Sequence, residues 1–387
     1  MLEIISLIIF GLSAFGILWA NAGYPISILL LGKVIRRENK KNKNYEPTVT
    51  IMIVAHNEEK VIKAKLENVL DIKYPKEKIE ILVSSDNSTD KTNKIVEQFI
   101  KKHPGKNIRL YEVKERKGKT NAQNEAAKTV KSEILVMTDA NAMLDKNAVK
   151  ELVSSFDKNV SYVTGRLMYS NSKKSLTSNT ENTYWDLDTK IRDIESRIQT
   201  ITAGNGAIYA CKTSEYHDFE PIKCHDSSMP LYYALNGKRA IANHKAIAYE
   251  KAGENDSDEF KRKIRMSRTI INAILPSIKI LNVFKCKWFT YFYLGHRTLR
   301  YSLWLNHILL LISSAILSFC NPLFIVPLVI QLIIYIMAIV KAIFKMNNRL
   351  FNFCSYYCMT ILAQLIGAIK TITGQNKPFW EKAESTR

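Results

Sequence analysis

Polar side chains follow three apolar runs of the sequence. The run ending at Ala55 leads into AHNEE, the run ending at Ser84 leads into SSDNSTD, and the run ending at Met137 leads into TDANA. Carboxylates are the ligands that Mg²⁺ and Mn²⁺ prefer, so acidic residues gathered at one place favour a ligand or metal site. Taken alone, Asn57 or Asp90 is equally well explained as the N-cap of a helix. Three such segments together favour a shared crevice.

The segments between these polar stretches alternate between strand and helix patterns. Short β-branched runs predict strands, and helical spacing of apolar residues predicts helices. The strands are expected at 48–55, 79–84, 108–113 and 133–137, and the helices at 58–70, 90–100 and 120–130. This alternation predicts an α/β domain with a mostly parallel sheet and helices on both faces, in which ligands bind beyond the carboxyl ends of the strands. Neither GxGxxG nor GxxxxGK[ST] occurs, so dinucleotide and P-loop sites lack their phosphate loops.

Long apolar stretches near both ends predict membrane helices. Residues 1–32 contain one acidic and no basic residue, and 303–340 contain no charged residue. About 20 apolar residues suffice to cross a bilayer. Six basic residues between 33 and 43 predict that the chain after the first helix is cytoplasmic. A cleaved signal peptide is the alternative for the first stretch, but its N-terminal flank carries no positive charge.

The net charge of +20, from 56 Lys and Arg against 36 Asp and Glu, is concentrated beside the apolar stretches. Residues 261–300 hold ten basic and no acidic residues. We interpret this block as interfacial helices that face anionic headgroups, with aromatic anchors. The expected anchors are Trp288, Phe289, Tyr291, Phe292 and Tyr293. Nucleic-acid binding would explain the charge, but not its position beside apolar helices.

These patterns divide the chain into six parts. They are an N-terminal transmembrane helix (1–32), a basic cytoplasmic linker (33–45), the α/β domain (46–260), basic amphipathic or interfacial helices (261–302), a C-terminal transmembrane region (303–373) and a tail (374–387). Asn321-Pro322 supplies a turn between two spans, because proline cannot continue the preceding helix. The segment 350–372 is long enough for a third span, but its polar residues also suit an interfacial helix.

The six cysteines show no CxxC spacing, so neither a disulfide framework nor a zinc ribbon is predicted. Cys211, His217, Cys224 and His225 stand near one another in the sequence and would be the only candidates for such a cluster. Their spacing matches no ligand pattern, and we favour ordinary loop and core roles for them.

The order of the motifs resembles glycosyltransferase family 2, in its membrane-bound branch that makes β-linked polysaccharides such as poly-N-acetylglucosamine, hyaluronan or cellulose. The motifs are AHNEE, SSDNSTDKT, RKGKTNAQNEA, TDANA, Tyr184-Trp185, AGNGAIYACK at 203–212, His225-Asp226, Arg262 to Arg265, a membrane hairpin and a tail from Trp380 to Arg387. The resemblance covers about residues 45–387. Each motif is weak alone, and their order is specific. It implies the GT-A fold for the α/β domain.

The resemblance implies a divalent metal, Mg²⁺ or Mn²⁺, at the third polar segment. Asp139 matches the first Asp of the family's DxD element. Asn141 stands at the second position and would be a neutral oxygen ligand, which weakens the expected metal affinity. The simpler explanation of Asn141 is a residue that starts a helix.

The donor would contact residues on the other two segments. Asp86 matches the family position that contacts the base, and Asn57 and Glu58 would lie near the base and ribose. Lys119 would reach the diphosphate as a point charge. A surface lysine is the simpler explanation of Lys119, because its neighbours are also basic.

Two arginines would hold the diphosphate leaving group. Arg262 and Arg265 occupy the first and last positions of (Q/R)xxR in the family's QxxRW motif. Residues three apart share a helix face and can bind one anion together. A helix that binds headgroups is the alternative. Met266 replaces the motif's tryptophan, which removes an aromatic platform and weakens the expectation of processive synthesis.

Asp226 matches the general base of the family, and a single base that takes the acceptor proton allows one inverting displacement. His225 stands where the family has another acid and is the alternative base. The acceptor would contact Trp185, Gly204 and Gly206. For Trp185, a core position is the alternative to a sugar-stacking role.

The resemblance therefore implies an inverting, metal-dependent transferase that takes a UDP-sugar, with UDP-N-acetylglucosamine as the favoured candidate, to a growing polysaccharide or a lipid-linked acceptor. It would be a multi-pass protein of the inner or plasma membrane with a cytoplasmic catalytic domain. Its expected partners are donor, acceptor, membrane lipids and export or polymerisation proteins, without nucleic acid. The alternatives are a single-sugar transferase to a polyprenyl phosphate or glycolipid, and a non-catalytic subunit that binds a nucleotide-sugar.

Overall fold

The computed structural model describes residues 1–170, 176–251, 256–346 and 348–379; within the helix at 176–198, side chains are described from Leu187 onward. The strands are β1 Val49–Ala55, β2 Ile79–Ser85, β3 Ile108–Glu112, β4 Ile134–Asp139, β5 Met143–Leu144, β6 Val160–Tyr169, β7 Ile208–Lys212 and β8 Arg239–Glu250. The first helices are α1 Leu2–Leu18, α2 Tyr24–Val34, α3 Ile62–Leu70, α4 Thr92–Lys102, α5 Lys119–Ala127, α6 Ala148–Val153, α7 Leu176–Ile198 and α8 His225–Leu235. The later helices are α9 Asp256–Met266, α10 Ile270–Ile274, α11 Val283–Cys286, α12 Trp288–Tyr293, α13 Leu299–Tyr301, α14 Leu303–Ser318, α15 Ile325–Phe344 and α16 Arg349–Ile372.

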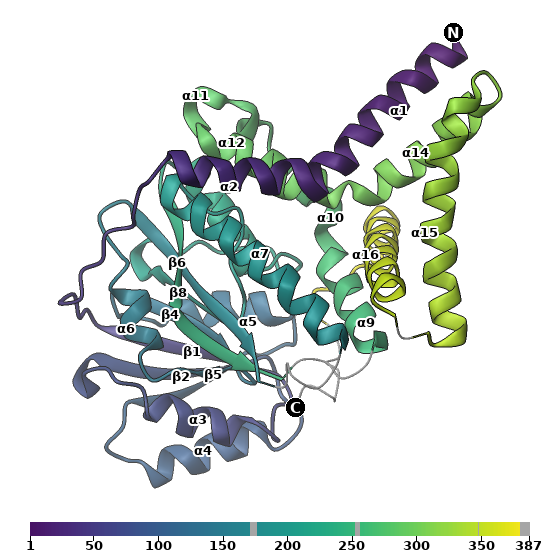
Figure 1. The fold of residues 1–387 in the computed structure, drawn as a ribbon. Coiled ribbons are helices and arrows are strands. Elements are labelled where there is room, and N and C mark those ends of the chain that lie inside the picture. The colour runs from purple at the N-terminus through teal and green to yellow at the C-terminus, as the bar shows by residue number, and fades with distance from the viewer. Residues whose placement is uncertain (171–175, 252–255, 347, 380–387) are drawn as a thin grey trace.

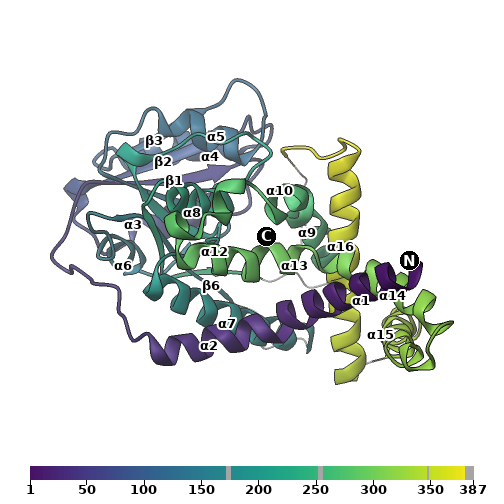
Figure 2. The ribbon, with the colours of Figure 1, turned by 90° about the horizontal axis from the view of Figure 1, so that it is seen from above.

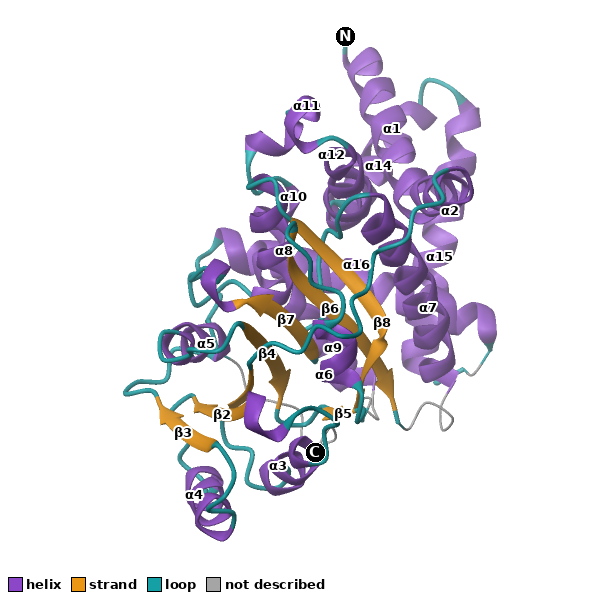
Figure 3. Cartoon of the chain, turned by 90° about the vertical axis from the view of Figure 1, so that its left-hand side faces the viewer, coloured by secondary structure: helices purple, strands orange, loops and turns teal. Residues whose placement is uncertain are grey.

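One sheet of eight strands forms the centre of the domain, in the order β3-β2-β1-β4-β7-β6-β8-β5 (Figure 3). Its first half, β3-β2-β1-β4, is parallel, as the alternation of strands and helices predicts. β7 runs antiparallel to both β4 and β6, β8 runs parallel to β6, and β5 runs antiparallel to β8. The predicted α/β fold is confirmed, and over its full width the sheet is mixed.

Two apolar cores lie on opposite faces of this sheet, and β1 shows how the sequence builds them. Ile51 and Ile53 join the core formed with α3, α4 and α6, whereas Met52 and Val54 join the core formed with α5 and α8. Figure 1 shows α3 and α4 beneath the sheet. Because successive side chains of a strand point to opposite faces, a strand covered on both sides must be apolar throughout.

Three described helices are long and apolar enough to cross a bilayer, namely Leu2–Val34, Pro322–Phe344 and Arg349–Ile372. The pair Trp288–Tyr301 and Leu303–Ser318 is a fourth candidate, bent by 61° at its break. By length and composition these agree with the predicted one N-terminal and two or three C-terminal spans. The Asn321 side chain accepts a hydrogen bond from the Leu323 N–H at 3.0 Å and starts the predicted turn between α14 and α15.

The apolar helices contact the α/β domain through α2, which packs on α7, and through α16. Figure 1 shows α15 along its length, whereas Figure 2 shows α15 nearly end-on and α16 along its length, so the two helices point in different directions. α16 packs on α9 and on the turn that follows α9. There a Cβ on Gly367 would stand 2.6 Å from the Ser267 carbonyl oxygen. The last apolar segment is thus a helix of spanning length whose one side docks on the domain.

The predicted aromatic anchors differ in their surroundings. Trp288 is 42% exposed, but Phe289, Phe292 and Tyr293 are buried. Phe292 packs with residues of α2 and α7, and the other two pack against α8 and Ile280. The prediction that these rings face headgroups is therefore wrong for these three, because α12 uses them to dock on the domain.

Candidate active site

The loop after β2 and the turn before α5 are joined through Asp86. Asp86 is 3% exposed; its Oδ2 accepts a hydrogen bond from the Gly118 N–H at 3.0 Å and its Oδ1 accepts one from the Lys117 N–H at 3.2 Å. Burial raises the pKa of Asp86, and these two donors act against that rise. Gly118 has a φ of +94°, a conformation that glycine adopts without strain. Asp86 therefore fixes the turn that begins α5 and positions Lys119.

Lys119 lies between two of the predicted acidic residues. Its ammonium forms an ion pair with the Asp139 carboxylate at the end of β4. A Cβ placed on Gly206 would stand 3.4 Å from Lys119 Nζ and 3.5 Å from Asp226 Oδ2, so both side chains converge on this glycine. Burial disfavours the charge of Lys119, but Asp139 and Asp226 outweigh it and raise the pKa of Lys119. The sequence-predicted lysine, carboxylates and glycine are thus brought together.

Asp226 begins α8 and is mostly buried. Burial raises the pKa of its carboxyl group; Lys119 lowers it and Asp139 raises it further. The Asp226 carbonyl accepts a hydrogen bond from the Gly204 N–H at 2.7 Å. A carboxylate with a raised pKa is suited to accept a proton from a bound hydroxyl.

His225, the alternative base, points elsewhere. Its Nδ1 lies 2.6 Å from Gln123 Oε1, and its Nε2 lies 2.8 Å from the Tyr216 hydroxyl. Burial, followed by the charge of Lys119, lowers its pKa to about 3, so the ring is neutral at physiological pH. Both ring nitrogens are engaged in the core between α5 and α8, which favours Asp226 as the base.

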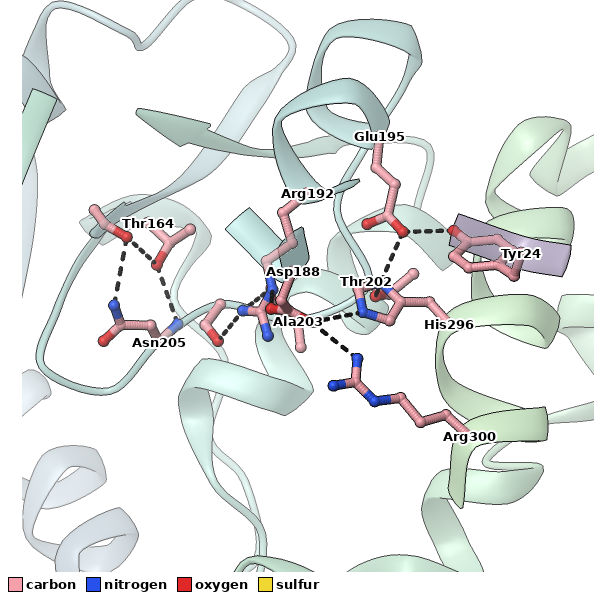
Figure 4. Close-up of polar contacts among 12 residues, drawn as sticks. Tyr24, Thr164, Asp188, Arg192, Glu195, Thr202, Ala203, Asn205, His296 and Arg300 are labelled. Atoms are coloured by element: carbon pink, nitrogen blue, oxygen red, sulfur yellow. Dashed lines mark hydrogen bonds and ion pairs between the residues drawn. The ribbon is translucent and has the colours of Figure 1, made fainter. Parts of the chain in front are cut away.

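The loop from Ala203 to Ala207 connects the acidic groups to one another. Asn205 N–H donates to Thr164 Oγ1 at 3.1 Å, and Thr138 Oγ1 donates to the Ala207 carbonyl at 2.8 Å (Figure 4 shows the Thr164 contact). Since Thr138 precedes Asp139 and Gly204 bonds to Asp226, this loop sets the spacing between the two carboxylates.

The buried Lys65 is bonded to residues on both sides of Asp139. Lys65 on α3 is fully buried, donates to Thr138 Oγ1 at 2.9 Å and also donates to the Ala142 carbonyl. Burial lowers its pKa to about 7, although Asp139 and Glu250 oppose this. The sequence carried a signal for this role, because Lys65 stands on the same helix face as Ile62 and Leu66, which are apolar.

Thr138→Val is expected to reduce the free energy of unfolding by about 1–3 kcal/mol, because it leaves the buried Lys65 ammonium and the Ala207 carbonyl without this hydroxyl. Thr138→Ser retains the hydroxyl and is the matched control, expected to be nearly as stable as the wild type. Denaturant unfolding of the solubilised protein measures both. A Val variant as stable as the Ser variant would contradict this role.

Glu250 is a further acid at the site that the sequence did not indicate. β8 pairs with β5, directly after the TDANA segment, so that Tyr249 lies opposite Met143. Burial and then the charge of Asp139 raise the pKa of Glu250. Only the pairing of strands more than 100 residues apart brings Glu250 here, which is why no local pattern predicts it.

The two arginines of α9 are positioned differently. Arg262 forms a two-point contact with Glu259, Nε to Oε2 at 2.6 Å and a terminal nitrogen to Oε1 at 2.7 Å. Burial lowers the pKa of Arg265, Arg262 lowers it further, and Asp139 raises it, so Arg265 stands within electrostatic reach of Asp139. Met266, at the position of the motif's tryptophan, is 51% exposed.

The chain after α16 covers the Gly118 turn. The Pro378 carbonyl would stand 2.5 Å from a Cβ on Gly118 and accepts a hydrogen bond from Arg268 at 3.2 Å. The Arg116 guanidinium lies 4.6 Å from the centre of the Phe379 ring. The predicted tail thus reaches the turn before α5 as far as residue 379; its remainder, 380–387, lies outside the described residues.

The other predicted residues have structural contacts of their own. Asn57 Oδ1 accepts a hydrogen bond from the Thr89 N–H at 2.8 Å, and the buried Glu58 donates its N–H to Thr92 Oγ1 at 2.8 Å. Asp90 Oδ1 accepts from the Thr92 N–H at 2.9 Å and so bonds the first residue of α4, although the N-cap position itself is Lys91. The predicted contact through the Trp185 side chain lies outside the described residues.

The residues at the end of β4 suit a divalent cation that is shared with a diphosphate. Among the described residues, no three His, Cys, Asp or Glu side chains gather closely enough to hold a metal alone. Asp139 and Asn141 supply a carboxylate and an amide oxygen, and Mg²⁺ or Mn²⁺ commonly completes such a set with water and substrate phosphates. The Cys and His residues considered as a metal cluster form none within the described part.

Comparisons with known proteins agree with this geometry. Residues 50–214 match the family Glycosyl transferase family 2. The chain is 34% identical to a probable glycosyltransferase, YdaM, of Bacillus subtilis over 36% of its own and 33% of the relative's length. It is 29% identical to a poly-β-1,6-N-acetyl-D-glucosamine synthase of Staphylococcus epidermidis over 29% and 26% of the two lengths. The matched segments thus span a third or less of these relatives.

One solved structure shares the architecture over almost the whole chain. The mannosyltransferase PcManGT of Pyrobaculum calidifontis, in complex with GDP-Man and Mn²⁺, superposes with a TM-score of 0.70 over 97% of this chain and 100% of its own, at 19% identity. At this identity the similarity establishes the fold, which includes the apolar helices. Together with the sequence match, it confirms the predicted GT-A fold, and the chain carries a domain of glycosyltransferase family 2.

Proposed function

We propose that this protein is an inverting, metal-dependent glycosyltransferase that takes its sugar from a UDP-sugar and works at the surface of a membrane. The observation that carries the proposal is the convergence of Lys119 and Asp226 on Gly206, with Asp139 paired to the same lysine. In this proposal Asp226 is the base, Lys119 the cation and Asp139 the carboxylate that binds the metal.

In this proposal the nucleotide lies along the β1 and β2 ends, with Asp86, Asn57 and Glu58 near the base and ribose. Asp139 and Asn141 would hold Mg²⁺ or Mn²⁺, which supplies charge stabilisation for the diphosphate when bound. Lys119 and Arg265 add positive charge near the diphosphate, and Arg262 adds further charge from α9, the helix that also carries Arg265. These groups stabilise the negative charge that develops on the leaving group.

Asp226 accepts the proton of the acceptor hydroxyl while the oxygen of that hydroxyl forms a bond to the anomeric carbon of the donor. The bond from that carbon to the phosphate oxygen breaks, and its electron pair leaves with the nucleoside diphosphate. One displacement from the opposite face inverts the anomeric configuration. Gly206 leaves room for the acceptor beside Asp226, and Gly204 fixes the Asp226 backbone.

The candidate spans support a multi-pass membrane location. The six basic residues at 33–43 favour a catalytic domain on the cytoplasmic side. The acceptor in this proposal is a polysaccharide or a lipid-linked sugar. UDP-N-acetylglucosamine is the first donor to test. A second candidate, transfer of a single sugar to a lipid-linked acceptor, is favoured by Met266, whose flexible and exposed side chain offers no aromatic platform to hold a growing chain.

A screen of nucleotide-sugars tests the proposal on the full-length protein in lipid nanodiscs with Mn²⁺. We expect release of UDP from one or a few UDP-sugars that requires the metal, and a membrane-bound or polymeric product. Product mass separates a ladder from a single added sugar. Binding of donors without turnover of any of them, with a lipid extract as the acceptor source, would favour a non-catalytic subunit instead.

A further inference from the structure

A buried network of charged side chains lies behind the acceptor side of the site, and the proposed chemistry does not use it. Asp188 and Glu195 on α7 are 3% and 0% exposed, and His296, between α12 and α13, is 4% exposed. Charged groups are rarely buried unless they are paired. Figure 4 shows how these groups connect α2, α7 and the segment between α12 and α13.

Arg192 is the member that reaches the active site. One of its terminal nitrogens donates hydrogen bonds to two consecutive carbonyls, Ala203 at 3.0 Å and Gly204 at 2.7 Å (Figure 4). The Gly204 N–H, which belongs to the same peptide group as the Ala203 carbonyl, donates a hydrogen bond to the Asp226 carbonyl. Arg192 thus holds the peptide groups on both sides of Gly204, and Asp226 also holds the first of them.

Arg192 is itself held by Asp188. Its Nε lies 2.6 Å from Asp188 Oδ2, while Asp188 Oδ1 accepts from His296 Nε2 at 3.0 Å and from Arg300 at 2.9 Å. Asp188 therefore binds three cationic side chains from two parts of the chain. The contact at Nε is an ion pair without hydrogen-bond geometry. The guanidinium is planar, so this ion pair and the two bonds from one terminal nitrogen relate Asp188 to the positions of the two carbonyls.

The network continues to the first apolar helix. His296 Nδ1 lies 2.8 Å from Glu195 Oε1, and the same oxygen accepts a hydrogen bond from the Tyr24 hydroxyl at 2.6 Å. Because both ring nitrogens of His296 face carboxylates, both are donors and the ring is an imidazolium. Tyr24 belongs to α2, the continuation of α1, so the first candidate span is connected to the loop at the active site.

We infer that Arg192 is a positioning residue for the acceptor loop 203–206, and that Asp188, Glu195, His296 and Tyr24 fix this loop relative to the membrane helix α2. The inference rests on the proposed function for the identity of the loop. A transferase whose acceptor lies at the membrane needs its acceptor-binding loop at a constant position relative to the bilayer. Misplacement of about 1 Å in such a loop can reduce a rate about 10²-fold.

Arg192→Lys tests the inference. Lysine retains the positive charge beside Asp188, but its single side-chain nitrogen cannot contact Asp188 and both loop carbonyls as the guanidinium does. We expect kcat for transfer to fall about 10- to 100-fold, with KM for the donor and the Mn²⁺ requirement within twofold of the wild type. Arg197→Lys is the matched control: Arg197 stands on the same helix and pairs with Asp193 four residues away, but does not contact the loop. It is expected to behave as the wild type.

Hydrogen exchange gives a readout that needs no turnover. In full-length protein in nanodiscs, peptides covering 200–207 are expected to exchange about 10-fold faster in Arg192→Lys than in Arg197→Lys, while the β1 and β4 peptides stay unchanged. Tyr24→Phe, which removes one hydroxyl, is expected to give a smaller increase in the same peptides and in those of α7.

The outcomes separate this inference from the proposed function. Unchanged exchange at 200–207 in Arg192→Lys, or an equal loss of donor affinity and transfer, would overturn the positioning role even if the wild type transfers sugar. A wild type without transferase activity but with the expected exchange pattern would overturn the proposed function and leave the network intact.

Discussion

An Asp226→Asn protein is expected to fold, to bind the UDP-sugar with nearly unchanged affinity, and to lose about 10²- to 10⁴-fold in kcat, the usual contribution of a general base. The asparagine preserves size and its backbone bond to Gly204 but cannot take the acceptor proton. Asp218→Asn, a change at an exposed aspartate outside the site, is the control and is expected to leave kcat unchanged.

The pH profile provides a second test of the same residue. Only the ionised carboxylate can accept the proton, and burial raises the pKa of Asp226. The acid limb of kcat/KM is therefore expected to lie above the range of an ordinary aspartate, with activity rising as pH increases through it. This limb should be absent from the residual activity of Asp226→Asn. Full turnover in that variant would refute the assignment.

Changes at Asp139 and Asn141 should move the metal requirement in opposite directions. Asp139→Asn removes the only carboxylate of the TDANA segment and is expected to reduce activity by at least about 10²-fold at low Mn²⁺. Asn141→Asp adds a second carboxylate at the other position and is expected to lower the Mn²⁺ concentration for half-maximal activity by about 10-fold, since affinity follows the charge of the ligand set.

Titration of activity against Mn²⁺ measures both effects, and binding of UDP–Mn²⁺ by calorimetry checks them without turnover. If both variants require the same Mn²⁺ concentration as the wild type, the metal binds elsewhere or takes no part in the reaction.

The parallel half of the sheet could be predicted, because strand and helix patterns alternate in that part of the sequence. β1, β2, β3 and β4 alternate with helices along the chain, and their parallel direction followed from that alternation. Their order in the sheet was not predicted. The second half could not be predicted in the same way, because β7 runs antiparallel and β8 crosses back to lie beside β6. No local pattern of residues specifies which distant strand is the neighbour.

The residues of the candidate site also fall into two groups, those that stand in local motifs and those that tertiary contacts bring there. Asp86, Lys119, Asp139 and Asp226 were predicted through the resemblance to the family's motifs, which are local in the sequence. Lys65 carried a signal that was missed, a lysine on an apolar helix face. Glu250 and Arg192 reach the site only through tertiary contacts across many residues. The aromatic residues of α12 were misjudged because composition does not distinguish a face that docks on protein from one that faces lipid.

The anomeric configuration of the product tests the central claim most directly. With Asp226 as the one base beside Lys119 and Asp139, the account predicts a single displacement. Proton NMR of the product formed from an α-linked UDP-sugar should therefore show a β-linkage. An α-linked product would contradict a single base at Asp226.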